Sequence, residues 1–202
     1  MNANRTLKLT TLALCGVLNI LGGTIALLLR LPVYLDSIGT VLAAALFGPV
    51  AGLVPGLISG LISGMTSDVY AFYYIPVQLV IGLFAGLVFY RLRPAKAAGS
   101  RREGLSFRSM GWKLFPAALA ISLPGTVVSS TITALVFGGI TSSGSTVLVQ
   151  LFHSLGMNLT LSVCVVQALT DFADRIIVLA AVLVLLPAVQ TAFGSITSKS
   201  GR

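Results

Sequence analysis

Long apolar runs separated by short polar stretches dominate the chain. A helix needs about 20 apolar residues to cross a bilayer, and most of these runs approach that length. The pattern predicts six transmembrane helices, at about 9–29, 35–47, 50–65, 73–90, 114–137 and 172–187. A further apolar stretch, 146–169, is expected to form a re-entrant or outward-facing helical hairpin before the last helix. The expected fold is one all-α integral membrane domain over residues 1–202.

The composition supports a membrane protein and excludes several other classes. The chain has 202 residues, of which 56% are hydrophobic and 9% charged, and its mean hydropathy is +1.00. Soluble domains carry about 25% charged residues, so this sequence cannot cover a water-facing surface. A soluble enzyme, a nucleic-acid-binding protein and a disordered tail are excluded. The net charge of +8 comes from residues between apolar runs rather than along one face, so no nucleic-acid partner is expected.

The positions of the basic residues predict the orientation in the membrane. If the N-terminus is cytoplasmic and four helices cross, the basic loop 91–113 is cytoplasmic as well. With the C-terminus inside, all of the 13 basic residues except Arg30 and Arg175 lie on that side, in agreement with the positive-inside rule. We therefore expect a multi-pass protein of the cell membrane with both termini cytoplasmic. If 146–169 crossed fully, the C-terminus would lie outside.

Signals for catalysis are weak. The chain has one histidine and lacks HExxH, GxSxG and clusters of cysteine with histidine, so no catalytic residue, metal or cofactor is expected, and the protein is not expected to be an enzyme. Asp171 and Asp174 lie near the predicted start of the last helix beside Arg175, where they are expected to complement the helix dipole rather than form a metal or acid–base pair. A phosphate-binding loop GxxxxGK[ST] is absent as well, so any ATPase would be on another chain.

Polar and aromatic side chains gather at the predicted outer ends of the helices. One interpretation is an aromatic belt at the level of the lipid headgroups. The other is an outward-facing cavity for a small polar ligand, because such cavities combine aromatic walls with a few donors and acceptors. The candidate substrate-binding residues are Tyr34, Asp36, Asp68, Tyr70, Tyr73, Tyr74, Gln78, His153 and Asn158.

Small residues recur at helical spacing in two places. Glycines four residues apart from Gly48 to Gly64 form a ladder on one helix face, and Thr11, Cys15 and Asn19 form a second stripe, in which Asn19 must find a hydrogen-bond partner. Such faces let helices approach closely in lipid. The approaching helix belongs either to the same chain or to another subunit. The candidate partner-interface residues are Thr11, Cys15, Gly16, Gly52, Gly56 and Gly60.

Several motifs together resemble one transporter family. The run from Leu35 to Thr40, the following segment that ends at Gly48-Pro49, and the glycine ladder are similar to the substrate-binding S components of energy-coupling factor (ECF) vitamin importers. The segments 75–86 and 169–176 resemble the same family, although lysine is more usual there than Arg175. The resemblance extends from about residue 8 to 187.

The resemblance implies a function and a set of partners. S components have six helices, capture a water-soluble vitamin outside at high affinity, and work with a transmembrane coupling subunit and two ATPases. They are thought to topple in the membrane to release the vitamin inward. The same resemblance places the nine candidate residues around the substrate and the small residues of the first helix at the coupling subunit.

The identity of the substrate stays open at this point. Few cations accompany the polar cluster, which favours a neutral ring such as pyridoxine or hydroxymethylpyrimidine; pantothenate remains open through Arg30, and cobalamin if the cavity is wide. The alternative functions are a stand-alone secondary carrier for a small polar solute and, less favoured, a membrane-embedded enzyme that uses Asp171 and Asp174.

Overall fold

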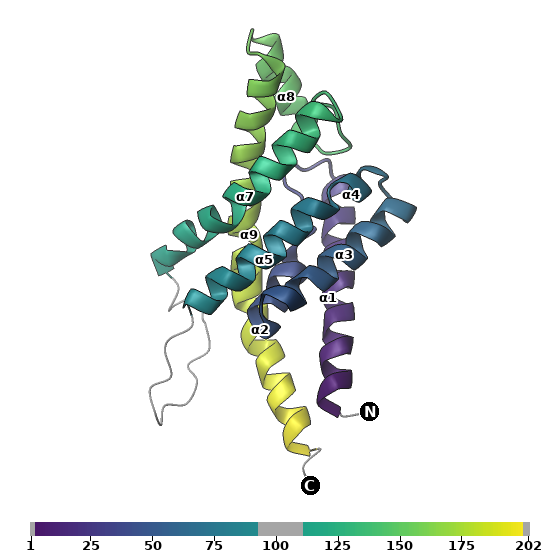
Figure 1. The fold of residues 1–202 in the computed structure, drawn as a ribbon, viewed down its shortest axis with the longest axis vertical. Helices are drawn as coiled ribbons and strands as arrows, with labels where there is room; N and C mark the ends of the chain where they lie inside the picture. Colours follow the sequence, from purple (N-terminus) through teal and green to yellow (C-terminus); the bar gives the residue numbers. More distant parts are fainter. Residues whose placement is uncertain (1–2, 93–110, 200–202) are drawn as a thin grey trace.

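The computed structural model describes residues 3–92 and 111–199, and every regular element in these ranges is helical. The interior of the predicted basic loop 91–113 lies outside the described residues. The elements are α1 (Ala3–Leu28), α2 (Ile38–Phe47), α3 (Pro49–Thr66), α4 (Tyr70–Tyr73), α5 (Ile75–Leu92), the 3-10 turn η1 (Gly111–Lys113), α7 (Leu114–Leu135), α8 (Ser145–Ser154) and α9 (Leu159–Lys199), as Figure 1 shows.

Five of the described helices are long and apolar enough to cross a membrane, namely α1, α3, α5, α7 and α9. This confirms the all-helical, multi-pass character predicted from the hydrophobic pattern. The predicted crossing at 35–47 is wrong, because α2 has 10 residues and is therefore only about 15 Å long, half the thickness of the hydrocarbon core. Gly48, at φ 95°, and Pro49 end α2 and begin α3.

The last part of the chain also differs from the prediction. Helix α9 has 41 residues and continues without a break through Asp171 and Pro187, so the expected hairpin segment is not separated from the last helix. Instead α8 packs back against the beginning of α9 around Val149, Val163 and Val166. The predicted division between 146–169 and 172–187 does not exist, because the polar residues near 171 lie inside a helix rather than in a turn.

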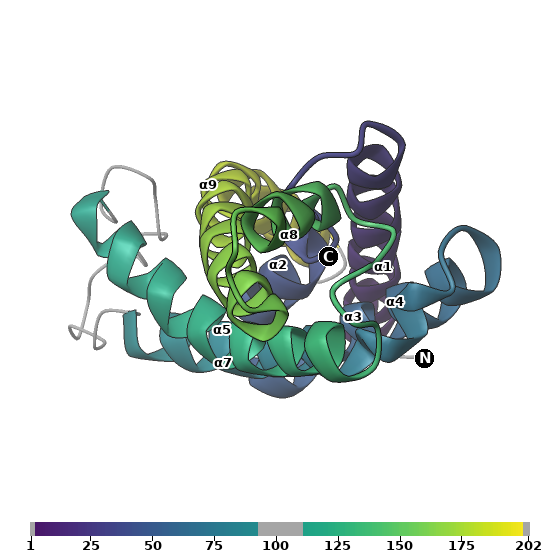
Figure 2. The ribbon, with the colours of Figure 1, turned by 90° about the horizontal axis from the view of Figure 1, so that it is seen from above.

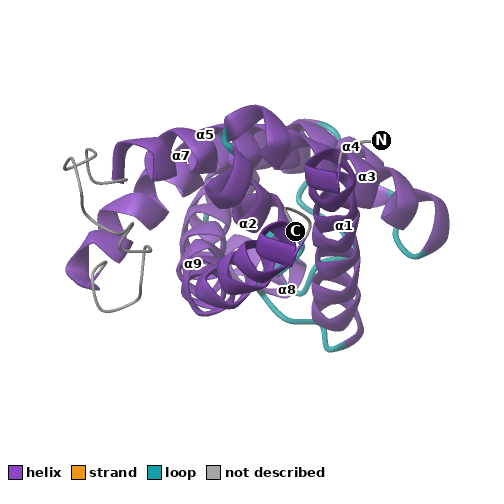
Figure 3. Cartoon of the chain, turned by 90° about the horizontal axis from the view of Figure 1, so that it is seen from below, coloured by secondary structure: helices purple, strands orange, loops and turns teal. Residues whose placement is uncertain are grey.

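The helices form two layers around α2. Seen from above and from below, α3, α5 and α7 lie side by side in one curved layer, with α1 and α9 on its other side (Figures 2 and 3). Helix α2 contacts α1, α3, α5 and α9, and its side chains from Gly39 to Ala45 are buried. The N-terminal end of α1 and the C-terminal end of α9 lie at the same end of the molecule (Figure 1). A short buried helix is therefore the centre of the bundle.

The glycine ladder of α3 packs against helices of the same chain. A methyl group at Gly52 would lie 2.7 Å from the side chain of Ala44, and one at Gly56 would lie 3.0 Å from Gln78. A methyl group at Gly60 would lie 2.5 Å from Ile75. These three positions were candidates for contact with another subunit, but α2 and α5 already cover them.

The small-residue stripe of α1 also faces inward. Thr11 and Cys15 are buried, and Gly16 lies against Ile58 of α3. The outward face of α1 instead carries large apolar side chains such as Leu14 and Leu21. The interpretation of Thr11, Cys15 and Gly16 as an exposed docking surface is therefore corrected to packing within the bundle.

The closest helix contact generates a stability prediction. A methyl group at Gly39 would lie 1.8 Å from the carbonyl oxygen of Cys15, so Gly39→Ala forces α1 and α2 apart. Overpacking of this kind costs about 1–3 kcal/mol, and we expect a melting temperature several degrees lower in detergent. Gly16→Ala is the control, because its new methyl group would make ordinary van der Waals contacts, with the Ile58 side chain at 3.5 Å and the Pro55 carbonyl oxygen at 4.0 Å. Equal melting temperatures for the two variants would contradict the close contact.

Candidate ligand-binding cavity

A cavity of about 130 Å³, lined by both apolar and polar residues, lies among the helices. Its walls come from the second half of α1, the loop 29–37, the second half of α3, the first half of α5, the middle of α7, the loop 141–143 and α9. These segments lie in the half of the bundle away from the N-terminal end of α1 and the C-terminal end of α9 (Figure 1). The cavity is much larger than the space of about 10–15 Å³ that one water molecule needs.

Most of the predicted substrate-binding residues meet at this cavity. Six of the nine line it, namely Tyr34, Asp36, Asp68, Tyr70, Tyr74 and Gln78. They come from the first loop, from the segment around α4 and from the start of α5, which are far apart in sequence. The structure therefore places these six side chains around one space.

The other three candidates lie elsewhere. Tyr73 is half exposed and packs edge-on against Phe137, with ring centroids 5.1 Å apart. His153 and Asn158 are exposed at the turn between α8 and α9, where His153 Nδ1 lies 2.9 Å from the carbonyl oxygen of Met157. None of the three lines the cavity, so their assignment to the site is corrected.

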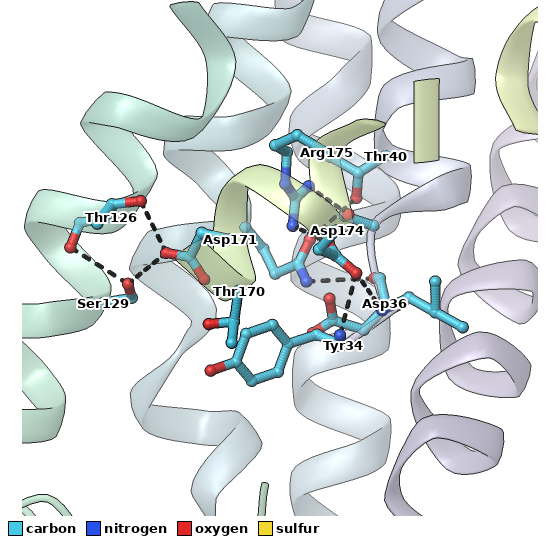
Figure 4. A network of polar contacts seen from close by, with 12 residues as sticks. Tyr34, Asp36, Thr40, Thr126, Ser129, Thr170, Asp171, Asp174 and Arg175 are labelled. Atoms are coloured by element: carbon cyan, nitrogen blue, oxygen red, sulfur yellow. Dashed lines mark hydrogen bonds and ion pairs between the residues drawn. The ribbon is translucent and has the colours of Figure 1, made fainter. Parts of the chain in front are cut away.

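The first loop is held in place by a buried ion pair of α9. Asp174 is fully buried, and its Oδ1 accepts hydrogen bonds from the backbone N–H groups of Tyr34 at 3.0 Å and Leu35 at 2.8 Å. Its Oδ2 pairs with Nη2 of Arg175 at 2.5 Å, and Nη1 of Arg175 donates to Ser37 (Figure 4). Leu35 has a left-handed backbone at φ 53°. These contacts hold the loop against α9 and bring Tyr34 and Asp36 to the cavity.

Asn19 organises the side of the cavity next to α2. Its side-chain amide donates to Thr40 Oγ1 at 2.8 Å and to Ser59 Oγ at 3.3 Å, and its Oδ1 accepts from the backbone N–H of Gly39 at 2.7 Å. The prediction that Asn19 must find a hydrogen-bond partner is confirmed, and its partners belong to the same chain. Thr40 in turn donates to Gln78 Oε1 at 3.3 Å. Four helices, α1, α2, α3 and α5, are thus joined by hydrogen bonds at the wall of the cavity.

A second chain of hydrogen bonds connects the loop to α9, α7 and α5. The hydroxyl of Tyr34 donates to Gln167 at 2.6 Å, and the amide of Gln167 donates to Thr133 at 2.8 Å. The hydroxyls of Thr133 and Tyr74 lie 2.6 Å apart. Burial raises the pKa of Tyr74 to about 12, so its hydroxyl remains a neutral donor near pH 7. Both tyrosine hydroxyls are occupied, which fixes the positions of their rings.

Asp171 belongs to the cavity, contrary to the prediction. Helix α9 begins at Leu159, so Asp171 and Asp174 lie inside the helix and cannot complement its N-terminus. Asp171 is buried, lines the cavity, and accepts hydrogen bonds at Oδ2 from Thr126 at 2.9 Å and Ser129 at 2.8 Å. The sequence contained a pattern that could have placed Asp171 at this site. Residues 167, 171 and 175 are polar, lie four positions apart in an apolar run, and therefore share one helix face.

The lining provides hydrogen-bonding groups and aromatic rings rather than a metal centre. In the part of the chain that the structure describes, no group of three or more His, Cys, Asp or Glu side chains gathers to hold a metal ion. Asp36 lies in the loop 29–37, where burial and then the nearby charge of Asp174 raise its pKa to about 6. Asp36 is therefore mainly ionised at pH 7 in a place that disfavours its charge.

The buried pair of α9 generates the second prediction. Asp174→Asn leaves Arg175 buried without its counter-charge, and removal of one partner from such a pair costs about 3–5 kcal/mol. We expect a large fall in the melting temperature of the purified protein. The double variant Asp174→Asn/Arg175→Met removes both charges and is expected to recover part of the loss. A single variant as stable as the unmodified chain would show that the pair does not anchor the loop.

Comparisons with known proteins were made by sequence and by structure. No protein-family model, no curated protein and no solved structure matches this chain.

Proposed function

We propose that this chain is the substrate-binding S component of an ECF-type importer, which binds a water-soluble vitamin from outside the cell and delivers it inward together with a transmembrane coupling subunit and two ATPases. The observation that carries the proposal is a cavity inside the apolar helical bundle at which the polar residues Tyr34, Asp36, Tyr74 and Gln78 meet. The motifs of the first loop and the glycine ladder, which resemble this family, support the same function.

The orientation follows from the charges and the arrangement of the helices. The two chain ends lie at the end of the molecule opposite the cavity (Figure 1). With the positive-inside rule, the chain ends and the basic segment 91–113 face the cytoplasm, and the cavity faces outward. Although α2 is too short to span, the chain still reverses direction before and after it. A six-segment S component is compatible with this path.

The size of the cavity narrows the range of vitamins. A volume of about 130 Å³ suits a molecule with one or two rings, because ligand sites enclose most of the ligand surface. Contact with the coupling subunit would have to use outward helix faces, since Thr11, Cys15 and the glycine ladder are covered by the chain's own helices.

The test is direct identification of the ligand. The chain is purified in detergent from cells grown in rich medium, denatured, and the released small molecules are identified by mass spectrometry. We expect one vitamin near one-to-one, rebinding in calorimetry to the emptied chain, and uptake into vesicles only when the coupling and ATPase subunits are present. An empty protein that binds no member of a vitamin panel would overturn the proposal.

Variants connect the bound vitamin to this cavity. Gln78→Ala is expected to weaken vitamin binding at least about tenfold, because a buried amide that fixes the ligand or its neighbours contributes on the order of 1–3 kcal/mol. His153→Ala and Asn158→Ala are the controls, since both side chains are exposed and lie outside the cavity. Loss of binding in the controls with none in Gln78→Ala would place the ligand elsewhere.

One observation favours a second candidate, a stand-alone secondary carrier. Asp171 is an ionisable residue inside a spanning helix and lines the cavity, and such residues often carry protons in transporters. This candidate predicts uptake by the chain alone in vesicles, abolished by an uncoupler and by Asp171→Asn. The ECF proposal predicts no uptake under the same conditions.

A further inference from the structure

The charges around the cavity are unbalanced. Three carboxylates line it, those of Asp36, Asp68 and Asp171, and Asp174 lies directly behind the lining. Among the described residues Arg175 is the cation that lines it. Arg30 is exposed and does not line the cavity, which removes the cation that had kept pantothenate open.

Arg175 cannot balance the three carboxylates. One of its terminal nitrogens pairs with Asp174 at 2.5 Å and the other donates to Ser37. Two of the five N–H groups of Arg175 are thus directed to groups that hold the first loop, and the carboxylate nearest to its charge is that of Asp174. A guanidinium in this state offers an incoming anion little, because the anion would compete with a buried carboxylate.

Asp171 has an acceptor available within the cavity. Its side chain is 6% exposed, and the hydroxyls of Thr126 and Ser129 both donate to Oδ2. Among the residues that the structure describes, no donor reaches Oδ1. Because Asp171 lines the cavity, Oδ1 can accept a hydrogen bond from a ligand or lie close to its positive charge.

Asp36 contributes a second carboxylate in need of positive charge. It belongs to the same lining, lies near the charge of Asp174, and receives only partial compensation from Arg175 and Gln78. Tyr34, Tyr70 and Tyr74 also line the cavity, and the rings of Tyr70 and Tyr74 pack against Phe137. Aromatic rings attract cations through their negative faces, so walls that combine carboxylates with tyrosines are suited to a positively charged ring.

We infer that the natural ligand of this cavity is a small cationic heteroaromatic molecule, with a quaternary or protonated ring nitrogen or an amidinium group that is recognised by Asp36, Asp171 and the surrounding tyrosines. This inference rests on the proposed function for the existence of a vitamin-like ligand, and it specifies the chemical class. The sequence alone favoured a neutral ring, because it could not show how Arg175 is paired. The inferred cationic ligand replaces that expectation. Anionic ligands are disfavoured by the same charges.

The test uses three probes with one ring and different charges. N1-methylnicotinamide is a cation, nicotinamide is neutral and nicotinate is an anion, and each is added at millimolar concentration to the purified, emptied chain. The cation is expected to raise the melting temperature most and to bind at least about tenfold more tightly in calorimetry than the other two. Equal or tighter binding of nicotinamide or nicotinate, or no binding of the cation, would overturn the inference.

Variants test whether the preference for a cationic probe comes from the carboxylates of Asp36 and Asp171. Asp171→Asn and Asp36→Asn are each expected to weaken binding of N1-methylnicotinamide at least about tenfold and that of nicotinamide by less than about threefold. Asp171→Glu keeps the charge and is expected to keep the preference, and His153→Ala is the control outside the cavity. An unchanged preference in both asparagine variants, with melting temperatures that indicate folded protein, would overturn the assignment.

The outcomes separate this inference from the proposed function. If the co-purified vitamin is neutral or anionic, the importer proposal stands and the cationic ligand is rejected. If the cationic probe binds while no vitamin is released or bound, the charge selectivity stands and the vitamin-importer proposal is rejected. If neither the probe nor any vitamin binds, both are rejected.

Discussion

The arrangement of the cavity depends on one buried ion pair. Moving charges from water into a low-dielectric interior is expensive unless every donor and acceptor is matched, and Asp174 and Arg175 are matched by two backbone N–H groups of the first loop and by Ser37. The cost of burying the pair is therefore offset only while the loop lies against α9. This makes the loop, with its left-handed Leu35, part of the interior rather than a surface connection.

The rest of the bundle follows from the absence of a hydrophobic driving force between helices in lipid. Close approach and hydrogen bonds must take over that role, and both are concentrated around α2. Gly39 lies against the backbone of α1, Gly52 lies against α2, and Asn19 joins α1, α2 and α3 through hydrogen bonds. Asn19 and Ser59, whose hydrogen bond joins α1 to α3, also line the cavity, so helix packing and the shape of the cavity depend on shared residues.

The hydrophobic pattern predicted the helical membrane fold and the approximate places of α1, α3, α5 and α7. It failed at α2 and α9 because hydropathy does not report where a helix ends. Gly48-Pro49 cuts one apolar run short, whereas Asp171 and Asp174 do not interrupt another.

The site was predicted in part, since Tyr34 and Gln78 do line the cavity. His153 and Asn158 were expected at the site but do not line the cavity, because α9 continues beyond the bundle. Asp171 was missed because its hydrogen-bond partners lie on α7.

The length of α9 has a mechanical consequence. A continuous helix behaves as a stiff rod. Asp174, close to the midpoint of α9, binds the backbone of the first loop. Between this point and Pro187 the rod is about 20 Å long, so a tilt of about 10° at the first loop would displace the helix at Pro187 sideways by roughly 3–4 Å. A movement of the first loop that tilted α9 would thus reach Pro187 through the helix itself, by leverage.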